Sequence, residues 1–258
     1  LEQKLDVLTK GLKAHIKGAY NSGVTDKRRR EGKADQYEAY LTESGETLIR
    51  KIQEAQTMGW TQEAGQSRDW YLEAALNFQR DFGLHHVSAL AMYNQTMKYY
   101  PSKNTGIPRS YVGFVGRATY DYKTRYLLDL SIGYNGSENF AKGKRFGLFP
   151  AFSLGWVISE EPFLQNNKVI SWLKVRGSYG EVGNDKLFIN GVEQRFLYYN
   201  DYVQSGGYYF GDKRWENGIM EGRIGNDNVT WERAKKFNIG LEMKLFEGLL
   251  GMTVDVFK

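Results

Sequence analysis

Apolar and polar residues alternate strictly along several segments of this chain. After Tyr126, every second residue is apolar or aromatic and the residues between are polar or small: Leu128, Leu130, Ile132 and Tyr134 alternate with Asp129, Ser131, Gly133 and Asn135. Successive side chains of a β-strand point to opposite faces, so this period of two predicts a strand with two different surroundings. Those surroundings are either a protein core and water, or lipid and a watery lumen.

The same alternation recurs elsewhere, each time over about ten residues, which is the length a tilted strand needs to cross a bilayer. The alternating segments are 12–20, 72–78, 116–122, 152–158, 173–179, 237–245 and 252–256. Segment 237–245 has the clearest pattern. Segment 86–96 carries apolar residues on both faces, and its position between two turns predicts a further strand.

The connections between these segments alternate between short and long. The short ones are 81–86, 122–125, 246–251 and the larger 159–171, which contains Pro162 and is expected to hold a helical turn. The long ones are 22–69, 97–110, 136–149 and 181–231. An up-and-down barrel with short turns at one rim and long loops at the other produces this order. A soluble sandwich has loops of mixed length at both ends.

Composition agrees with a β-protein and excludes several classes. Aromatic residues make up 15% of the 258 residues, Gly is abundant at 29 and Pro is only 4, which favours strands and tight turns. The net charge of +5 is too balanced to indicate nucleic-acid binding, and the basic run 27–30 is expected to be a solvated loop. With no Cys, a disulfide-stapled scaffold and thiolate metal sites are excluded. Neither end resembles a natural terminus, so a piece of a longer chain is expected.

Tyr and Trp residues lie mostly near the ends of the alternating segments, as in the aromatic belts at membrane–water interfaces. Aromatic residues are also common in ordinary strands, so this observation alone is indecisive. The polar faces carry full charges, such as Lys236, Glu242 and Lys244. Such faces suit a wide, water-filled lumen better than the packed interior of a small barrel.

Three long blocks, 115–164, 172–185 and 228–257, resemble the SusC/RagA family of TonB-linked (TonB-dependent) outer-membrane proteins. The resemblance covers nearly the whole chain and is weakest across 23–69 and 186–227. It implies an all-β fold: an antiparallel, up-and-down transmembrane β-barrel of about 22 strands with long extracellular loops and a plugged lumen. Residues 1–258 would supply about nine strands of this partial barrel domain. The plug domain and the final strands would lie outside the sequence.

The resemblance also implies a function and a location. The chain would belong to a SusC-like transporter that actively imports glycan or peptide fragments across the bacterial outer membrane. Its partners would be a SusD-like surface lipoprotein and, through the plug, the TonB complex. Leu128, Leu130, Ile132 and Tyr134 would then face lipid, and 122–125 would be a periplasmic turn. The alternatives are a secreted, soluble, β-rich carbohydrate-binding module and a barrel enzyme. The sequence fixes neither the substrate nor the oligomeric state.

Candidate chemistry is sparse. The sequence shows no catalytic constellation, no metal-ligand set and no cofactor motif, and His15, His85 and His86 have no evident partner. Segments 183–185 and 225–228 offer oxygen ligands for a hard cation such as calcium, but Asn and Asp beside Gly are also ordinary turn formers.

Loop 198–215 is the most suggestive stretch for recognition. Its aromatic residues Tyr208, Tyr209, Phe210 and Trp215 are candidates for contact with a substrate or partner, because aromatic faces beside polar groups suit sugars and peptides. The alternative is that these rings pack the loop against itself. Trp215 and Trp231 are expected to fix the base of this loop.

Overall fold

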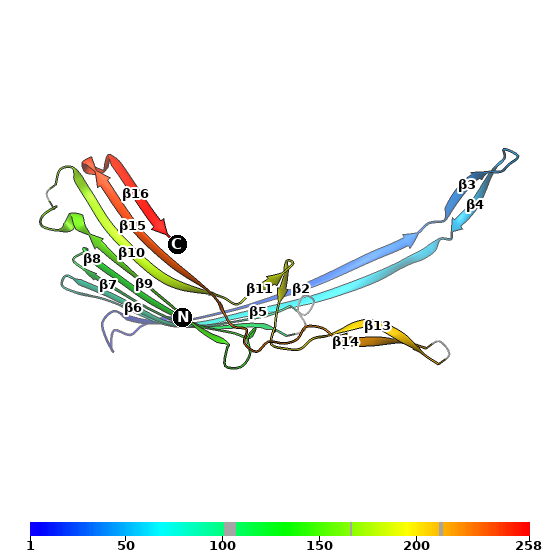
Figure 1. Cartoon of the computed structure of the whole chain (residues 1–258), viewed down its shortest axis with the longest axis horizontal. Helices are drawn as coiled ribbons and strands as arrows, with labels where there is room; N and C mark the ends of the chain where they lie inside the picture. Colours follow the sequence, from blue (N-terminus) through cyan, green and yellow to red (C-terminus); the bar gives the residue numbers. More distant parts are fainter. Residues whose placement is uncertain (101–106, 166, 212–213) are drawn as a thin grey trace. The chain divides into compact units, whose positions relative to one another are not determined.

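The computed structural model describes residues 1–100, 107–165, 167–211 and 214–258, and nearly all of its regular structure is β-strand (Figure 1). The strands are β1 Glu2–Lys4, β2 Leu12–Lys33, β3 Gln36–Leu41, β4 Thr47–Gln53, β5 Gln56–Phe82, β6 His85–Tyr99, β7 Arg109–Tyr122, β8 Tyr126–Ser137, β9 Phe146–Val157, β10 Ile170–Asn184, β11 Leu187–Ile189, β12 Val192–Gln194, β13 Tyr202–Phe210, β14 Arg214–Glu221, β15 Glu232–Leu245 and β16 Leu250–Phe257. Two 3-10 turns, η1 and η2, span Ile158–Glu160 and Phe246–Gly248. Within the described residues, no helix is long and apolar enough to span a membrane.

Ten strands form one antiparallel sheet in the order β1-β2-β5-β6-β7-β8-β9-β10-β15-β16. Each strand pairs with its sequence neighbour in the sheet, as in an up-and-down barrel wall, so the predicted fold class is confirmed. The count is ten rather than about nine because the short strand β1, Glu2–Lys4, pairs with β2 at the sheet edge. Three residues are too few to produce a readable alternation.

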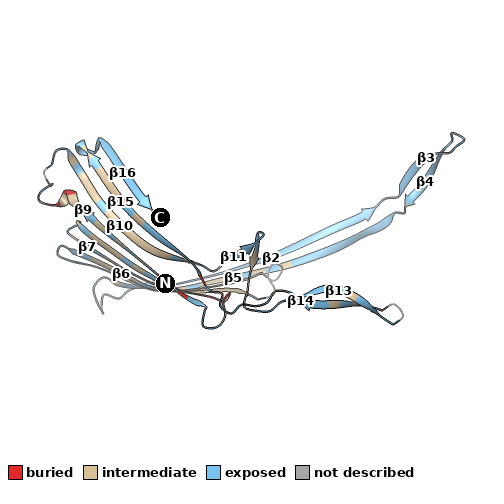
Figure 2. Ribbon diagram, in the orientation of Figure 1, coloured by how far each residue is buried: buried red, intermediate tan, exposed pale blue. Residues whose placement is uncertain are grey.

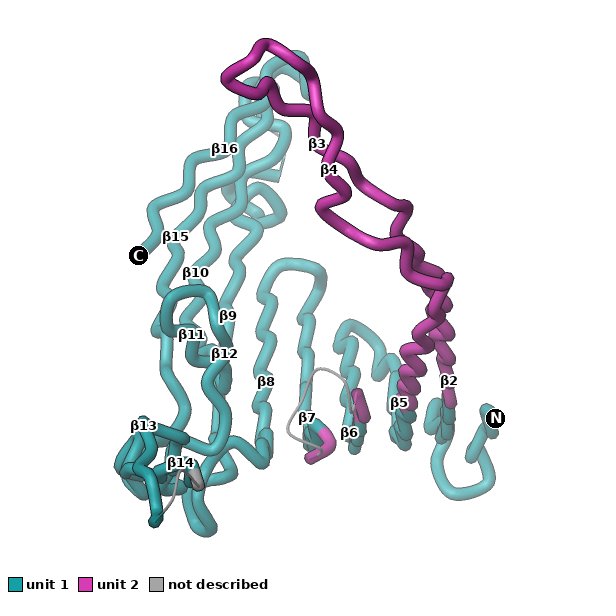
Figure 3. Tube along the Cα trace, turned by 90° about the vertical axis from the view of Figure 1, so that its right-hand side faces the viewer, with its two compact units in different colours: residues 1–19, 70–97, 109–258 teal, residues 20–69, 98–108 magenta. Residues whose placement is uncertain are grey.

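The chain divides into two compact units (Figure 3). Unit 1 comprises residues 1–19, 70–97 and 109–258, and unit 2 comprises residues 20–69 and 98–108. Strands β2, β5 and β6 contribute residues to both units.

The alternation along β8 separates two faces in the structure. Leu130, Ile132 and Tyr134 are 46%, 45% and 42% exposed and share one face, called here the apolar face of unit 1. The opposite face carries Asp129 and Ser131, called here the polar face. Strands β7, β8, β9, β10, β15 and β16 pair in register, with one irregularity between Ile170 and Trp172 of β10, so that apolar positions lie beside apolar positions of the next strand. This register extends the two faces over these six strands.

Charged groups on the polar face pair across strands. Arg117 of β7 donates from Nε to the Asp129 carboxylate of β8 at 3.1 Å. Arg176 of β10 donates to Glu242 of β15 at 2.9 Å and to Asp255 of β16 at 2.7 Å. Gly240 lies beneath this guanidinium group, and a Cβ added there would approach Arg176 Cζ to 2.8 Å. The polar face is therefore organised by ion pairs rather than by an apolar core.

The short connections close as tight turns where the sequence places them. In 122–125, Lys123 and Thr124 both have positive φ, 54° and 57°, and the Thr124 N–H donates to Asp121 Oδ1 at 2.6 Å. Two successive positive φ values are typical of the type I′ hairpin turn, whose twist matches that of the strands. The helical turn expected in 159–171 is η1, which begins one residue earlier.

In unit 2, the structure differs from two sequence predictions, those for segment 22–69 and for the basic run 27–30. Segment 22–69 is largely strand, because β2 runs on to Lys33, β5 starts at Gln56, and β3 and β4 pair as a hairpin between them. The basic run 27–30 therefore lies in strand β2 rather than in a loop. Figure 2 shows β3 and β4 almost wholly exposed. A strand that is solvated on both faces needs no apolar alternation, so the sequence pattern missed it.

The buried core is small and lies in unit 1. Phe140, Phe149 and Trp231 are 4%, 7% and 7% exposed and pack together, with Tyr111 and Val229 against them. The Phe140 and Trp231 ring centroids are 5.4 Å apart, and those of Phe149 and Trp231 are 5.3 Å apart. The Trp231 indole N–H also donates to the Arg145 carbonyl at 3.0 Å. This cluster ties the start of β15 to the β8–β9 connection.

Candidate functional site

The four aromatic candidates lie together on one hairpin, formed by β13 and β14. The strands pair in register with Tyr209 opposite Trp215, and a register shift lies between Gln204 and Gly207. Residues 202–210 and 214–215 of the predicted loop 198–215 therefore belong to paired strands rather than to an irregular loop, and 212–213 lie outside the described residues. Because side chains alternate between faces, Tyr208 and Phe210 lie on one face of the hairpin, and Tyr209 and Trp215 lie on the other.

The aromatic rings form two edge-to-face pairs. The Tyr208 and Phe210 centroids are 4.9 Å apart, and those of Tyr209 and Trp215 are 5.0 Å apart. All four side chains still remain exposed, by 53%, 57%, 67% and 51% for Tyr208, Phe210, Tyr209 and Trp215. The Trp215 indole N–H donates to Asn217 Oδ1 at 3.1 Å. The rings thus pack on each other and hold defined positions, while each keeps a face open to solvent.

The absence of a side chain at Gly207 leaves room for the Trp215 indole. A Cβ at Gly207 would lie 2.5 Å from Trp215 Cζ2 and 2.5 Å from the Glu216 carbonyl oxygen. The indole therefore lies over the bare backbone of the opposite strand. The prediction that Trp215 and Trp231 both fix the loop base is right for the buried Trp231 and wrong for Trp215, which is half exposed on the hairpin.

A second hairpin, β11–β12, was not predicted. Its turn residues Asn190 and Gly191 have positive φ values of 51° and 77°. Asn-Gly between short apolar runs is the strongest local hairpin signal, and the sequence "LFINGVEQ" contains it. Leu187, Ile189 and Val192 share one face and are 47%, 50% and 63% exposed. The sequence signal was therefore present in a segment that the long-range alternation does not cover.

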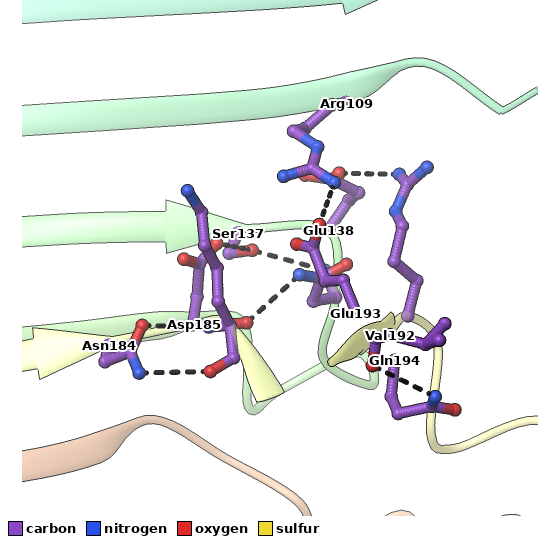
Figure 4. A network of polar contacts seen from close by, with 11 residues as sticks. Arg109, Ser137, Glu138, Asn184, Asp185, Val192, Glu193 and Gln194 are labelled. Carbon is purple, nitrogen blue, oxygen red and sulfur yellow. Dashed lines mark hydrogen bonds and ion pairs between the residues drawn. The ribbon is translucent and has the colours of Figure 1, made fainter. Parts of the chain in front are cut away.

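A polar network holds the β11–β12 hairpin against the ends of β7, β8 and β10 (Figure 4). Arg109 of β7 donates to Glu193 of β12 at 2.6 Å. Arg195 pairs with Glu138 at 2.9 Å, with side chains only 10% and 18% exposed. Low exposure strengthens such charge-assisted hydrogen bonds and makes breaking one costly. The hairpin is therefore fixed at its base by two ion pairs.

The two Asn/Asp-Gly segments take part in this framework. The Ser137 hydroxyl donates to the Asp185 carboxylate at 2.6 Å, and Asn139 Nδ2 donates to the Asp185 carbonyl at 3.1 Å. In the second segment, Asn226 Oδ1 accepts the Asn228 N–H at 2.9 Å, as in an Asx turn. Among the residues the structure describes, no three His, Cys, Asp or Glu side chains converge as a metal site would require.

All three histidines have partners, contrary to the expectation from sequence. His15 Nε2 lies 2.7 Å from Glu73 Oε1, and the Tyr71 hydroxyl donates to the other oxygen of the same carboxylate. His85 Nδ1 lies 2.8 Å from the Tyr120 hydroxyl, and His86 Nδ1 lies 2.7 Å from Asp81 Oδ1. His15 and Glu73 are 58 residues apart, so only strand pairing brings them together.

The Glu161 carboxylate connects the turn that follows β9 to the neighbouring strands by hydrogen bonds. Glu161 Oε1 accepts from the Tyr126 hydroxyl at 2.6 Å and from the Trp156 indole N–H at 3.1 Å. Arg125 lies 3.6 Å from Glu161 Oε2. The hydrogen bond from Tyr126, followed by that from Trp156, holds the pKa of Glu161 below its ordinary value. Tyr126 and Trp156 are cross-strand neighbours, so the carboxylate gathers the polar ends of two aromatic side chains at the strand ends.

Comparison with known proteins places this geometry in a family. The model of the TonB dependent receptor-like β-barrel family matches residues 6–258. A TonB-dependent receptor of Formosa agariphila is 35% identical over 139 residues, which are 54% of this chain and 12% of that protein. The TonB-dependent receptor SusC of Bacteroides thetaiotaomicron is 31% identical over 161 residues, 60% of this chain and 15% of SusC. The chain thus spans only a small part of these relatives.

A solved structure has the same fold. The RagAB peptide transporter structure superposes with a TM-score of 0.64 at 17% identity, over 96% of this chain and 28% of that one. At this identity the likeness concerns the fold alone. With the family match, the single up-and-down sheet and its two distinct faces, the conclusion is that this chain belongs to the TonB-dependent receptor-like β-barrel family.

Proposed function

We propose that this chain forms part of the barrel wall of an outer-membrane transporter that imports glycan or peptide fragments. The observation that carries the proposal is the apolar face of unit 1. It extends over a single sheet layer and leaves side chains such as Leu154 and Ile239 57% and 48% exposed. Lipid satisfies such a face when the polar face lines a watery lumen. Residues 1–258 would then be a partial barrel domain, with a plug domain and further strands elsewhere in the protein.

The proposed transporter works with partners. A SusD-like surface lipoprotein would cap the extracellular mouth, and the TonB complex would act on the plug to open the lumen. Membership of the TonB-dependent receptor-like family supports the TonB complex as a partner, and the similarity to SusC supports the lipoprotein. Transport of this kind needs no chemical reaction at the substrate, and we assign this chain no catalytic role.

Strand parity supports an orientation. Each strand of the wall reverses direction, so the short turns 82–86, 122–125 and 246–251 fall at one rim, and hairpins β11–β12 and β13–β14 start from the opposite strand ends. Outer-membrane barrels place short turns in the periplasm and long connections outside. The aromatic residues Tyr208, Tyr209, Phe210 and Trp215 would then lie on the extracellular side, where they would contact the substrate or the capping lipoprotein.

A soluble carbohydrate-binding module is the alternative, and one observation weighs against it. A sandwich covers the apolar face of each sheet with a second sheet about 10 Å away. In the part of the chain that the structure describes, a single ten-stranded sheet carries the apolar face, and the other sheets are two-stranded hairpins. Such hairpins are too small to cover it. Membrane burial therefore accounts for this face better than a second layer does.

Epitope tags test the orientation in the full-length protein. A tag inserted at Gly206, which has an open surrounding and a positive φ of 55°, should be reached by antibody on whole cells. A tag at Thr124 should be reached only after the outer membrane is opened. Antibody access to the Thr124 tag on intact cells would invert the topology and overturn the proposed roles of both rims.

A further inference from the structure

The apolar face of unit 1 contains a hollow near the short-turn ends of β8, β9 and β10. Its volume is about 600 Å³, and it is lined by Tyr120, Tyr126, Leu127, Leu128, Leu154, Gly155, Trp156, Val175, Arg176 and Gly177. By the alternation of side chains along each strand, most of these residues belong to the apolar face. The hollow is therefore a feature of the outer surface of the wall rather than of the lumen.

Gly177 creates this hollow. Across the strands, Gly177 lies between Leu154 of β9 and Ile239 of β15, where every neighbour on this face carries a large side chain. A Cβ added at Gly177 would meet only the Asn238 carbonyl oxygen, at 4.0 Å. The missing side chain thus leaves a notch that the neighbouring residues do not fill.

The rim end of the hollow is aromatic. Tyr126 and Trp156 are cross-strand neighbours, and Trp156 in turn lies opposite Val175. The Tyr126 hydroxyl and the Trp156 indole N–H both donate hydrogen bonds to Glu161, which lies beyond the strand ends. Their apolar ring surfaces are therefore left to form the wall of the hollow nearest the membrane–water interface.

A cation stands beside this wall. Lys123 Nζ lies 5.3 Å from the centroid of the Tyr122 ring, and Tyr122 stacks on Tyr126 with centroids 6.3 Å apart. Arg125, the other cation of the turn, is already paired with Glu161. Among the ion pairs of the described residues, none includes Lys123, whose charge reaches Glu161 only at longer range and there helps to lower the pKa of that carboxyl after the hydrogen bonds from Tyr126 and Trp156. Lys123 is therefore the cation with ammonium N–H groups available to an external anion at the mouth of the hollow.

We propose that this hollow is a binding site for one glycerophospholipid, whose acyl chain lies in the notch over Gly177 and whose headgroup phosphate pairs with Lys123. This inference rests on the proposed orientation, in which the short turns lie at the periplasmic leaflet. Every lipid around a barrel touches apolar side chains, so apolar contact alone selects nothing. The site would select a phospholipid by two features. The notch over Gly177 fits an acyl chain, and Lys123, next to the aromatic residues at the interface, attracts the phosphate.

The test uses native mass spectrometry of the full-length transporter, purified with its natural lipid partners and titrated with phosphatidylglycerol. Gly177→Val adds a side chain to the notch, and its Cβ would meet only the Asn238 carbonyl oxygen, at 4.0 Å. Its matched control is Ala74→Val, which adds bulk to another hollow on the same apolar face, lined by Ala14, Ala74, Ala91 and Gly116 among others. The proposal predicts that Gly177→Val loses one bound phospholipid per chain and that Ala74→Val retains it.

The charge is tested separately. Lys123→Glu should weaken phosphatidylglycerol binding at this site at least about fivefold, whereas Lys123→Arg should leave it nearly unchanged. Diacylglycerol with the same acyl chains, which lacks the phosphate, should bind equally to the wild type and to Lys123→Glu. Unchanged phospholipid retention in Gly177→Val, or a Lys123→Glu effect that diacylglycerol shares, would overturn the proposal. The tags at Gly206 and Thr124 report on the orientation independently, so the two failures are distinguishable.

Discussion

Strand β15 and hairpin β13–β14 both use antiparallel pairing and both expose large side chains, but they distribute these side chains differently. On β15, Phe237 and Ile239 lie on one face, and Asn238 and Glu242 lie on the other. On the hairpin, Tyr208 projects from one face and Tyr209 from the other, and both are more than half exposed. A strand with one apolar face matches two different surroundings, whereas aromatic groups on both faces suit water or a partner on either side.

The two regions also differ in the contacts that stabilise them. The wall joins distant strands by backbone pairing and by charge pairs on its polar face, such as Arg176 with Asp255, 79 residues apart. Among the described residues, β13 and β14 pair only with each other, and one pair of aromatic rings packs on each face of the hairpin. A change on the wall should therefore affect assembly in lipid, and a change on the hairpin should affect recognition.

The largest expected effect is a charge on the apolar face. Ile239→Arg should destabilise the barrel by roughly 2–4 kcal/mol if the residue lies near the bilayer midplane. The measurement is folding of the full-length protein into lipid. Asn238 is a poor control because its Oδ1 accepts from Arg176 at 3.2 Å. Thr253→Arg is better matched, since Thr253 lies on the polar face opposite Glu242, and it should cost little. Equal costs at the two positions would remove the distinction between the faces.

Removing the central cation of the polar face should have the next largest effect. Arg176→Met leaves Glu242 and Asp255 without their shared partner, so the two carboxylates repel each other. The Arg176 side chain is 35% exposed, and solvent screening reduces the expected loss to about 1–2 kcal/mol. Arg176→Met combined with Asp255→Asn should recover part of that loss in the same folding measurement. If the double variant is no more stable than Arg176→Met, the ion pairs do not organise this face.

Changes to the aromatic residues of hairpin β13–β14 should reduce uptake and leave barrel assembly intact. Replacement of Tyr208, Tyr209 and Trp215 by Ala should lower substrate uptake or lipoprotein binding at least about tenfold, as loss of clustered aromatic contacts does at interfaces. Tyr202→Ala is the control, because Tyr202 is 63% exposed on the same hairpin but outside the two ring pairs. A loss of barrel assembly in the triple variant, or an equal loss of uptake in Tyr202→Ala, would contradict this division of roles.

The smallest expected effect concerns pH. The pKa of Glu161 is lowered in the folded protein by the hydrogen bonds from Tyr126 and Trp156. The ionised form therefore stabilises the fold, fully above the unfolded-state pKa of about 4.3, and this contribution is lost as the pH falls through the folded-state pKa. The melting temperature of wild type should exceed that of Glu161→Gln at pH 7, and the gap should narrow below about pH 4.3. A gap that is constant down to pH 3 would contradict the assignment.

Much of the wall was readable from the sequence because each strand there has two unlike surroundings. Alternation along β8 and β15 identified the strands, their faces and the short turns between them. Unit 2 has charged residues on both faces of its strands, so segment 22–69 carries no such pattern. The β11–β12 hairpin needed the local Asn190-Gly191 signal instead. The aromatic candidates were correctly brought together by proximity in sequence, but their division between two faces depends on register.

Contacts between distant strands could not be predicted. His15 meets Glu73 and Arg109 meets Glu193, 84 residues away, because strand order and register bring them together. The Glu161 contacts with Tyr126 and Trp156 likewise depend on how η1 folds back. Periodicity indicates which face a side chain occupies, but it contains no information on the residue that lies across the sheet.

The most direct test of the central claim is a spin-label accessibility scan along β15, residues 236–245, in the full-length protein in lipid vesicles. The account predicts a period of two: labels at Phe237, Ile239 and Leu241 should collide mainly with lipid-soluble oxygen, and labels at Asn238 and Glu242 mainly with a water-soluble nickel chelate. Equal access of both reagents along the strand, or water access at the odd-numbered positions, would contradict the assignment of the apolar face to lipid.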